Sequence, residues 1–307
     1  MDELAAWMWL SDTADSQTEE ALRLLEKFSS PQKVAEAKPD AIRNFVSERF
    51  AAALKRNRPR YESPEATRRL ADLITSGGNL TTLHESDFPQ QLQSIANPPL
   101  TLFRRGSLRT FQNTIAVIGT RSPTHRGYTV GRKIAELLAS EGYCIVSGLA
   151  RGTDTMAHCG ALDAGGTTVA VLPGPLTFLY PPENEFLAHD IERRGALLAE
   201  NSPMVSIEGR PAQRYRWVNR NRITSGLSEA VVVVEATDVG GSMHQVRFAS
   251  EQGRPTFILR PDADVPSPLR RGYEKAVAVG ARPFIDPEDL LTYLRHKPNE
   301  RQSTLDA

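Results

Sequence analysis

Six short apolar runs, rich in β-branched residues, limit the possible folds of this chain more than any other feature. They are TIAVIG (114–119), YCIVSG (143–148), TTVAVLPG (167–174), ALLAE (196–200), AVVVVEA (230–236) and PTFILR (255–260). Segments with apolar residues at helical spacing separate them. Continuously apolar runs are typical of strands that are buried on both faces. We therefore expect an α/β fold, an extended Rossmann-like, doubly wound and mostly parallel sheet with a small N-terminal helical domain.

The region before these runs has a different pattern. Between Thr18 and Arg56, apolar residues recur at helical spacing. The basic, proline-containing run RNRPRYESPEATRR (56–69) predicts a linker or exposed loop that leads into another short helix. The chain has 307 residues, which is enough for two domains of ordinary size. The predicted division is a helical N-terminal domain (1–75), a Rossmann-like domain (76–296) and a polar C-terminal tail (297–307).

Charge composition argues against indiscriminate binding to polyanions. Lysine plus arginine and aspartate plus glutamate both number 37, so any polyanion site must be local. The acidic N-terminus does not resemble a signal peptide, and no run approaches the roughly 18 apolar residues of a membrane span. Cys144 and Cys159 lack the spacing of a zinc site. We expect a cytoplasmic chain with no membrane partner, no metal and no cofactor.

Glycine-containing loops that follow the predicted strands and precede helices are typical of anion-binding sites. In a doubly wound sheet such loops gather at the carboxyl edge, where ligands bind. The predicted phosphate-binding residues are Gly119, Thr120, Arg121 and Arg126 in the first loop, Ser147, Gly148 and Arg151 in the second, and Gly240, Gly241 and Ser242 in the last. No loop carries the GxGxxG fingerprint, so a dinucleotide is poorly supported. Taken alone, the first loop fits an ordinary strand-to-helix turn equally well.

A stretch rich in arginine and aromatic residues precedes the fifth run. Five arginines and no acidic residue lie between Gly209 and Arg222, with Tyr215 and Trp217 among them. Guanidinium groups bind phosphate bidentately, and aromatic faces stack on bases. This combination is what binding of single-stranded nucleic acid requires, so the stretch predicts such a site. The competing interpretation is a solvated basic loop whose tryptophan packs into the core.

Asp154 and His158 lie four residues apart on one face of a predicted helix. Such a pair could transfer protons, but no nucleophile stands at a recognisable elbow such as GxSxG. We therefore favour a role in holding the loop and expect no catalytic residue.

Taken together, these motifs resemble the DNA-processing protein A family, DprA, also called Smf. The matching segments are VIGTR (117–121), SGLARGTDTMAH (147–158), GGTTVAVL (165–172), YPPEN (180–184), RWVNRNRITSGLS (216–228) and VVEA (233–236). The resemblance implies a non-enzymatic protein that binds single-stranded DNA, dimerises through its Rossmann-like domain and loads the RecA recombinase during natural transformation. It also implies that Gly119 to Arg121 lie in the DNA-binding pocket. The contacts with single-stranded DNA that it implies in the basic stretch are Trp217, Arg220, Asn221 and Arg222.

The chain departs from the family pattern at several points. Trp217 replaces the usual phenylalanine, GGSMHQ (240–245) and ILRP (258–261) replace family sequences, and we expect no C-terminal winged-helix domain. These departures leave open another DNA-linked pathway, such as phage defence.

Two other function classes stay open. One is a nucleotide-binding or nucleotide-hydrolysing enzyme that resembles the phosphoribohydrolases of the LOG type, with Glu235 as the remaining acid. Gln245 and Arg247 stand where that chemistry would want an acid, which weakens the comparison. The other is an interaction module whose N-terminal helices recruit a partner while the pocket senses a nucleotide.

Overall fold

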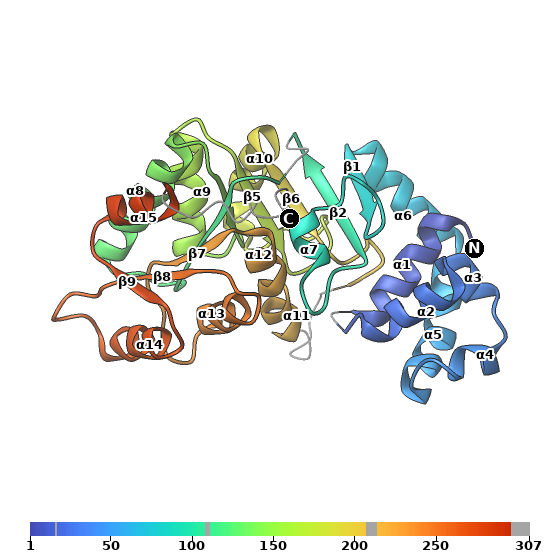
Figure 1. Ribbon diagram of the computed structural model, residues 1–307. Coiled ribbons are helices and arrows are strands. Elements are labelled where there is room, and N and C mark those ends of the chain that lie inside the picture. Colours follow the sequence, from blue (N-terminus) through green and yellow to red (C-terminus); the bar gives the residue numbers. More distant parts are fainter. Residues whose placement is uncertain (16, 108–110, 207–213, 296–307) are drawn as a thin grey trace, which may run out of the picture.

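A computed structural model describes residues 1–15, 17–107, 111–206 and 214–295 (Figure 1). Its centre is a nine-stranded sheet in the order β1-β2-β6-β5-β4-β3-β7-β8-β9. The strands are β1 (Gly78–Thr82), β2 (Thr101–Gly106), β3 (Thr114–Ile118), β4 (Cys144–Ser147), β5 (Thr168–Leu172), β6 (Ala196–Ala199), β7 (Ala230–Val233), β8 (Thr256–Leu259) and β9 (Arg282–Phe284). In this order, every neighbouring pair of strands between β6 and β9 is parallel, including β5, β4 and β3. The predicted doubly wound, mostly parallel sheet is confirmed.

Two strands extend the parallel sheet in a way that the sequence did not indicate. β2 pairs with β6 in antiparallel register, and β1 pairs with β2 in the same way. Both strands carry polar residues and glycine, GNLTT and TLFRRG, so neither shows the long apolar pattern of the central strands. They cover the edge of β6, which would otherwise present unpaired backbone groups.

Helices cover both faces of the sheet. Those outside the N-terminal region are α7 (Gln90–Gln93), α8 (His125–Ser140), α9 (Thr153–Asp163), η1 (Pro182–Asn184), α10 (Glu185–Arg194), α11 (Arg214–Asn219), α12 (Asn221–Leu227), α13 (Gly241–Glu251), α14 (Ser267–Ala278) and α15 (Pro287–Arg295). Side chains of β3 alternate between two buried clusters, as the two-residue period of a strand requires. Ile115 and Val117 pack with α8, α9 and α15, whereas Ala116 and Ile118 pack with α13 and α14.

Six helices precede the sheet: α1 (Glu3–Ala14), α2 (Glu19–Phe28), α3 (Pro31–Glu36), α4 (Pro39–Arg43), α5 (Glu48–Tyr61) and α6 (Pro64–Thr75). Figure 1 shows them at the end of the molecule beside β1 and β2. The predicted linker at 56–69 is wrong, because α5 continues to Tyr61 with Pro59 in its last turn and α6 begins at Pro64. Only Glu62 and Ser63 connect the two helices.

The N-terminal helices share one buried cluster with the sheet. Trp9 and Leu10 of α1 belong to the same cluster as Phe103 of β2 and Leu197 of β6. The Thr101 hydroxyl donates a hydrogen bond to Ser11 Oγ at 2.8 Å, across the same boundary. The division of the chain into domains at residue 75 therefore stays a prediction from sequence, and residues 297–307 lie outside the described part. Among the described helices, none is long and apolar enough to cross a membrane.

The strand order creates a crevice at the carboxyl edge of the sheet. From β3 the chain proceeds through β4, β5 and β6 on one side and returns to β7 on the other side of β3. The loops after β3 and β7 therefore lead away in opposite directions. In α/β sheets, ligands bind at such a switch point.

Candidate nucleic-acid interface

A cavity of about 590 Å³ lies at this switch point. Its wall combines the loops after β3 and β4, the segment from α11 to α12 and the start of α13. The lining residues are Ile118, Gly119, Thr120, Arg121, Gly148, Ala150, Asp154, Tyr180, Trp217, Val218, Arg220, Asn221, Thr224, Thr237, Val239, Gly240, Gly241, Ser242 and Gln245. Ten of the fourteen residues predicted to bind phosphate or DNA are therefore gathered around one cavity.

Close packing fixes the loop after β3. The Thr120 amide donates to the Glu235 carbonyl at 2.7 Å, and the Thr153 amide donates to the Thr120 carbonyl at 3.1 Å. A Cβ at Gly119 would lie 2.8 Å from the Glu235 carbonyl oxygen, so only glycine fits this approach without a shift. The loop therefore presents Arg121 from a rigid support.

Arg121 and the aromatic rings form the rim of the cavity. The Arg121 side chain is exposed, and its guanidinium carbon lies 5.8 Å from the Trp217 ring centroid. No carboxylate in the described residues forms an ion pair with it. Tyr180 meets Trp217 edge to face at 5.1 Å between centroids. The rim therefore offers an unpaired cation beside two aromatic rings, which is the combination that phosphates and stacked bases require.

Arg220 forms part of the floor of the cavity. It is 9% exposed, and its guanidinium donates to the Val171 carbonyl. A Cβ on Gly148 would overlap that guanidinium, so the glycine makes room for it. Burial lowers the pKa of Arg220, and the charge of Asp154 opposes this shift. The Nε atom of Arg220 is buried and has no hydrogen-bond partner among the described residues, which leaves one strong donor unused there.

Asp154 is a buried residue of the cavity lining, and His158 is fully buried beneath it. Burial raises the pKa of Asp154, which Arg220 counteracts, and its carboxylate accepts a hydrogen bond from the Ala150 amide at 3.3 Å. His158 is fully buried, and burial lowers its pKa to about 3. Thr168 donates its hydroxyl to the Ile145 carbonyl, so His158 Nδ1, at 2.7 Å from Thr168 Oγ1, must be the donor to it. A neutral imidazole without solvent access supports a structural role for this pair.

The start of α13 closes the far side of the cavity. Gly240 caps the helix, and Gly241 is its first residue. Asn221 donates to the Gly241 carbonyl at 3.2 Å, while Gln245 donates to the Asn221 carbonyl at 3.1 Å. These two bonds join α12 to α13. Gln245 therefore supports the cavity wall. From the sequence it was noted only because a phosphoribohydrolase would have an acid in that region.

Four predicted contact residues do not line the cavity. Arg222 is buried in a bidentate ion pair with Glu200, with Nη1 at 2.8 Å from Oε2. Ser147 donates to the Val117 carbonyl inside the sheet. Arg126 contacts the loop after β8 by donating to the Arg260 carbonyl, and Arg151 pairs with Glu183. Their contacts with DNA stay predictions. Arg210, the first of the five arginines in the basic stretch, lies outside the described residues.

Sequence reasoning missed the aromatic part that the YPPEN loop plays in the rim. Tyr180 is not among the binding residues predicted from the sequence, yet it is 40% exposed and lines the cavity. Phe178 stacks on it with centroids 6.0 Å apart. A pair of aromatic residues two positions apart in a proline-rich loop was the available signal. Its partner Trp217 lies 37 positions further along, so only the fold reveals the pairing.

Glu235 does not line the cavity, and its carboxylate is hydrogen-bonded to the loop before α8. Its two carboxylate oxygens accept hydrogen bonds from the Thr124 amide at 2.8 Å and the Thr124 hydroxyl at 2.6 Å. A Cβ on Gly127 would lie 2.5 Å from its carboxyl carbon, so α8 packs directly on it. The carboxylate thus braces the loop before α8, and this arrangement does not favour its use as a hydrolytic acid.

Comparisons with known proteins agree on one family. The family model described as DNA recombination-mediator protein A matches residues 79–295. DNA processing protein DprA of Bacillus subtilis is 35% identical over 255 residues, which are 82% of this chain and 84% of that protein. Protein Smf of Escherichia coli is 36% identical over 209 residues, 68% of this chain, but the match spans only 54% of that relative.

Two solved structures are similar over most of their length. The X-ray structure of DNA processing protein A from Streptococcus pneumoniae has a TM-score of 0.77 and 26% identity, and it covers 95% of this chain and 98% of its own. That of Helicobacter pylori, described for its single-stranded DNA binding mode, has a TM-score of 0.61 and 27% identity. It covers 71% of this chain and 96% of its own.

Proposed function

This chain belongs to the DNA recombination-mediator protein A family, and we propose that it binds single-stranded DNA, without catalytic turnover, in the cavity at the switch point. The observation that carries the proposal is the rim, where Arg121, which forms no ion pair within the described part of the chain, lies beside the rings of Trp217 and Tyr180. Guanidinium groups hold phosphates, and rings stack on unpaired bases whatever their identity. Bases in a duplex are already stacked on each other, so the rim favours a single strand.

The decisive experiment is a salt series of binding to a labelled oligothymidine. For a single strand, log affinity falls with log salt with a slope of about −0.7 per phosphate contact. Arg121→Ala should weaken binding about tenfold or more and reduce the slope by about 0.7. Arg68→Ala is the matched control, because Arg68 is an exposed arginine on α6 that pairs with Asp72. Equal affinity of parent and Arg121→Ala at all salt concentrations would remove the proposal.

Duplex and mononucleotide arms separate this function from the enzymatic one. We expect the duplex to bind more weakly than the single strand, and nucleoside monophosphates to stay intact. Release of free base that is lost in Glu235→Gln would favour a phosphoribohydrolase instead. The contacts of Glu235 with Thr124 support the non-enzymatic expectation.

Assembly and pathway are further parts of the proposal. We propose a homodimer formed through the Rossmann-like domain, located in the cytoplasm, which loads RecA onto DNA. Family membership supports these expectations, as does the described role of relatives in DNA processing. Natural transformation is the proposed setting, with phage defence as the competing one. Light scattering of the purified chain tests the dimer, and co-sedimentation with RecA on single-stranded DNA tests the partnership.

A further inference from the structure

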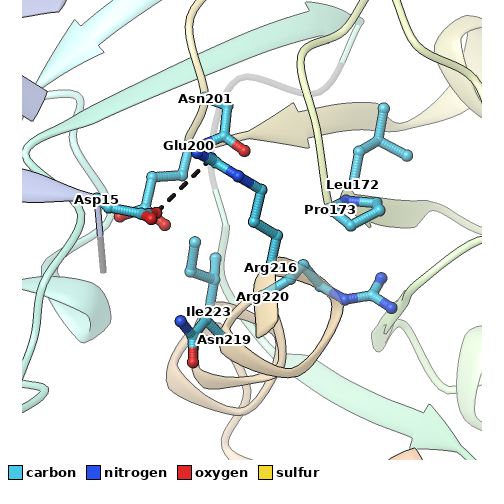
Figure 2. A pocket seen from close by; sticks show the side chains of 9 residues that line it. All are labelled: Asp15, Leu172, Pro173, Glu200, Asn201, Arg216, Asn219, Arg220 and Ile223. Atoms are coloured by element: carbon cyan, nitrogen blue, oxygen red, sulfur yellow. Dashed lines mark ion pairs between the residues drawn. The ribbon is translucent and has the colours of Figure 1, made fainter. Parts of the chain in front are cut away.

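Asp15, at the end of α1, contacts α11, the helix that carries Trp217. The Tyr215 hydroxyl donates a hydrogen bond to Asp15 Oδ2. Arg216 Nη1 lies 3.7 Å from Asp15 Oδ1, and both of these side chains are largely buried (Figure 2). Asp15 thus contacts two consecutive residues of α11 from the end of α1.

The backbone of Asp15 is unusual for its residue type. As the C-cap of α1 it has φ 52° and ψ −128°, a region that residues other than glycine rarely adopt. Glycine would occupy this position at lower conformational cost. An aspartate here therefore needs a compensating interaction, and its contacts with α11 supply one.

The last turn of α1 is also bonded to neighbouring parts of the molecule. Asp12, one turn before Asp15, accepts hydrogen bonds from the Ser202 amide at 3.1 Å and from the Tyr61 hydroxyl at 2.6 Å. Ser202 follows β6, so its bond ties α1 to the sheet, and the Tyr61 bond ties α1 to α5. The position of Asp15 is consequently fixed relative to the strands whose ends form the cavity.

The position of α11 matters because its side chains reach two places. Figure 2 shows Arg216 and Arg220, four residues apart, extending in different directions, with Arg216 directed at Asp15. Arg220 reaches the cavity floor at Val171, and Trp217 lies at the rim. The cavity between Asp15, Arg216 and Arg220 is only about 10 Å³, about one water molecule, so the contact is closely packed. None of the α11 residues from Tyr215 to Asn219 is fully buried. Core packing therefore contributes little to the position of this helix, and contacts such as those with Asp15 matter more.

We propose that Asp15 is a positioning residue for the DNA site: it holds α11 so that Trp217 and Arg220 keep the orientation needed for single-stranded DNA. The inference rests on the proposed function. Asp15 itself contacts no DNA, and its effect passes through Tyr215 and Arg216. The N-terminal helices thereby contribute to affinity although they do not line the cavity.

Asp15→Gly separates this role from a purely structural one. Glycine relieves the unfavourable backbone, so the melting temperature should stay equal or rise, while the affinity for oligothymidine falls about tenfold, the equivalent of ~1.4 kcal/mol. The salt slope should not change, because no phosphate contact is lost. Ser29→Gly is the matched control, since exposed Ser29 caps α2 with φ 67° and, among the described residues, forms no hydrogen bond with α11. It should leave the affinity unchanged.

A double-mutant cycle and hydrogen exchange complete the test. Tyr215→Phe removes only the hydroxyl that Asp15 accepts, so its effect on affinity should not add fully to that of Asp15→Gly. Amides of residues 214–227 should exchange faster in the DNA-free Asp15→Gly protein than in the parent or in Ser29→Gly.

Two results would overturn the inference while leaving the proposed function intact. One is parental affinity and exchange in Asp15→Gly. The other is tighter binding with a steeper salt slope, which would mean that Asp15 holds Arg216 back from phosphate. A parent protein that binds no single-stranded DNA would instead remove the proposed function, and this inference with it.

Discussion

The rim of the cavity and the layer beneath it use arginine in opposite ways. At the rim, Arg121 is exposed and forms no ion pair with a described carboxylate. In the layer beneath, Arg220 and Arg222 are buried and bound to a carbonyl and to Glu200 respectively. An exposed guanidinium can exchange water for phosphate, whereas a buried paired one must first lose its partner. Charge alone therefore does not distinguish a ligand contact from a structural one; burial and pairing do.

The largest expected effect tests the buried layer. Arg222→Ala would leave Glu200, whose side chain is 11% exposed, without its counter-ion. Removing one partner of a buried ion pair costs about 3–5 kcal/mol of unfolding free energy. Urea denaturation measures this loss, and Glu200→Gln added to Arg222→Ala should recover part of it. A loss of unfolding free energy below about 1 kcal/mol, together with a large drop in DNA affinity, would mean that Arg222 contacts DNA as Arg121 is expected to do.

The next prediction concerns the boundary between the two layers. In Gly148→Ala the new methyl group overlaps the Arg220 guanidinium, so the side chain must move. Overpacking of this kind costs about 1–3 kcal/mol of stability. We expect weaker binding to oligothymidine as well, because the cavity floor is rearranged. Unchanged affinity in a folded Gly148→Ala protein would show that Arg220 serves the scaffold alone.

Trp217 tests the rim directly. Trp217→Ala should weaken binding by about 1–3 kcal/mol, the usual contribution of one stacked base, whereas Trp217→Phe should retain most of the affinity. Unfolding free energy should change less than in Arg222→Ala, because Trp217 is only half-buried. Equal losses of affinity in the Ala and Phe variants would indicate that the indole is needed for more than stacking.

The last prediction concerns a pH dependence that arises beneath the cavity floor and is absent at neutral pH. His158 has a folded pKa of about 3, below its ordinary 6.5, so the unfolded state binds the extra proton between these values. Stability is therefore complete above pH 6.5 and falls as pH decreases toward 3, by at most ~1.4 kcal/mol per pH unit. The raised pKa of Asp154 has the opposite sign, since the folded state then holds its proton more tightly.

Comparison of the parent with His158→Asn isolates the histidine. Unfolding free energies at pH 4, 5, 6 and 7 should show a flatter acid limb in the variant, because Asp154 contributes to both proteins. Parallel curves would mean that His158 is protonated in the folded protein, contrary to its buried environment.

The sequence predicted the central fold because strands such as β7 are unbroken apolar runs with few alternative structures. β1 and β2 escaped prediction, since their polar residues pair through the backbone and do not form a long apolar pattern. The linker prediction failed because Pro59 was treated as a helix breaker, whereas the helix continues two residues beyond it.

The candidate site was predictable to the extent that it lies in strand-end loops. Glycines such as Gly119 and Gly148 mark places where another group approaches the backbone, and both line the cavity. The pairing of Arg222 with Glu200 joins residues 22 positions apart, and the support of α11 by Asp15 spans 200. Such contacts depend on how the elements pack, which local pattern does not encode.

The buried cluster shared by α1, β2 and β6 has a consequence for how this protein can be divided. A chain cut at residue 75 would expose Phe103 and Leu197 on one fragment and Trp9 on the other. Both fragments would expose large apolar surfaces and would tend to aggregate. Gain or loss of the N-terminal helices during evolution would therefore require a replacement cover for the same strands.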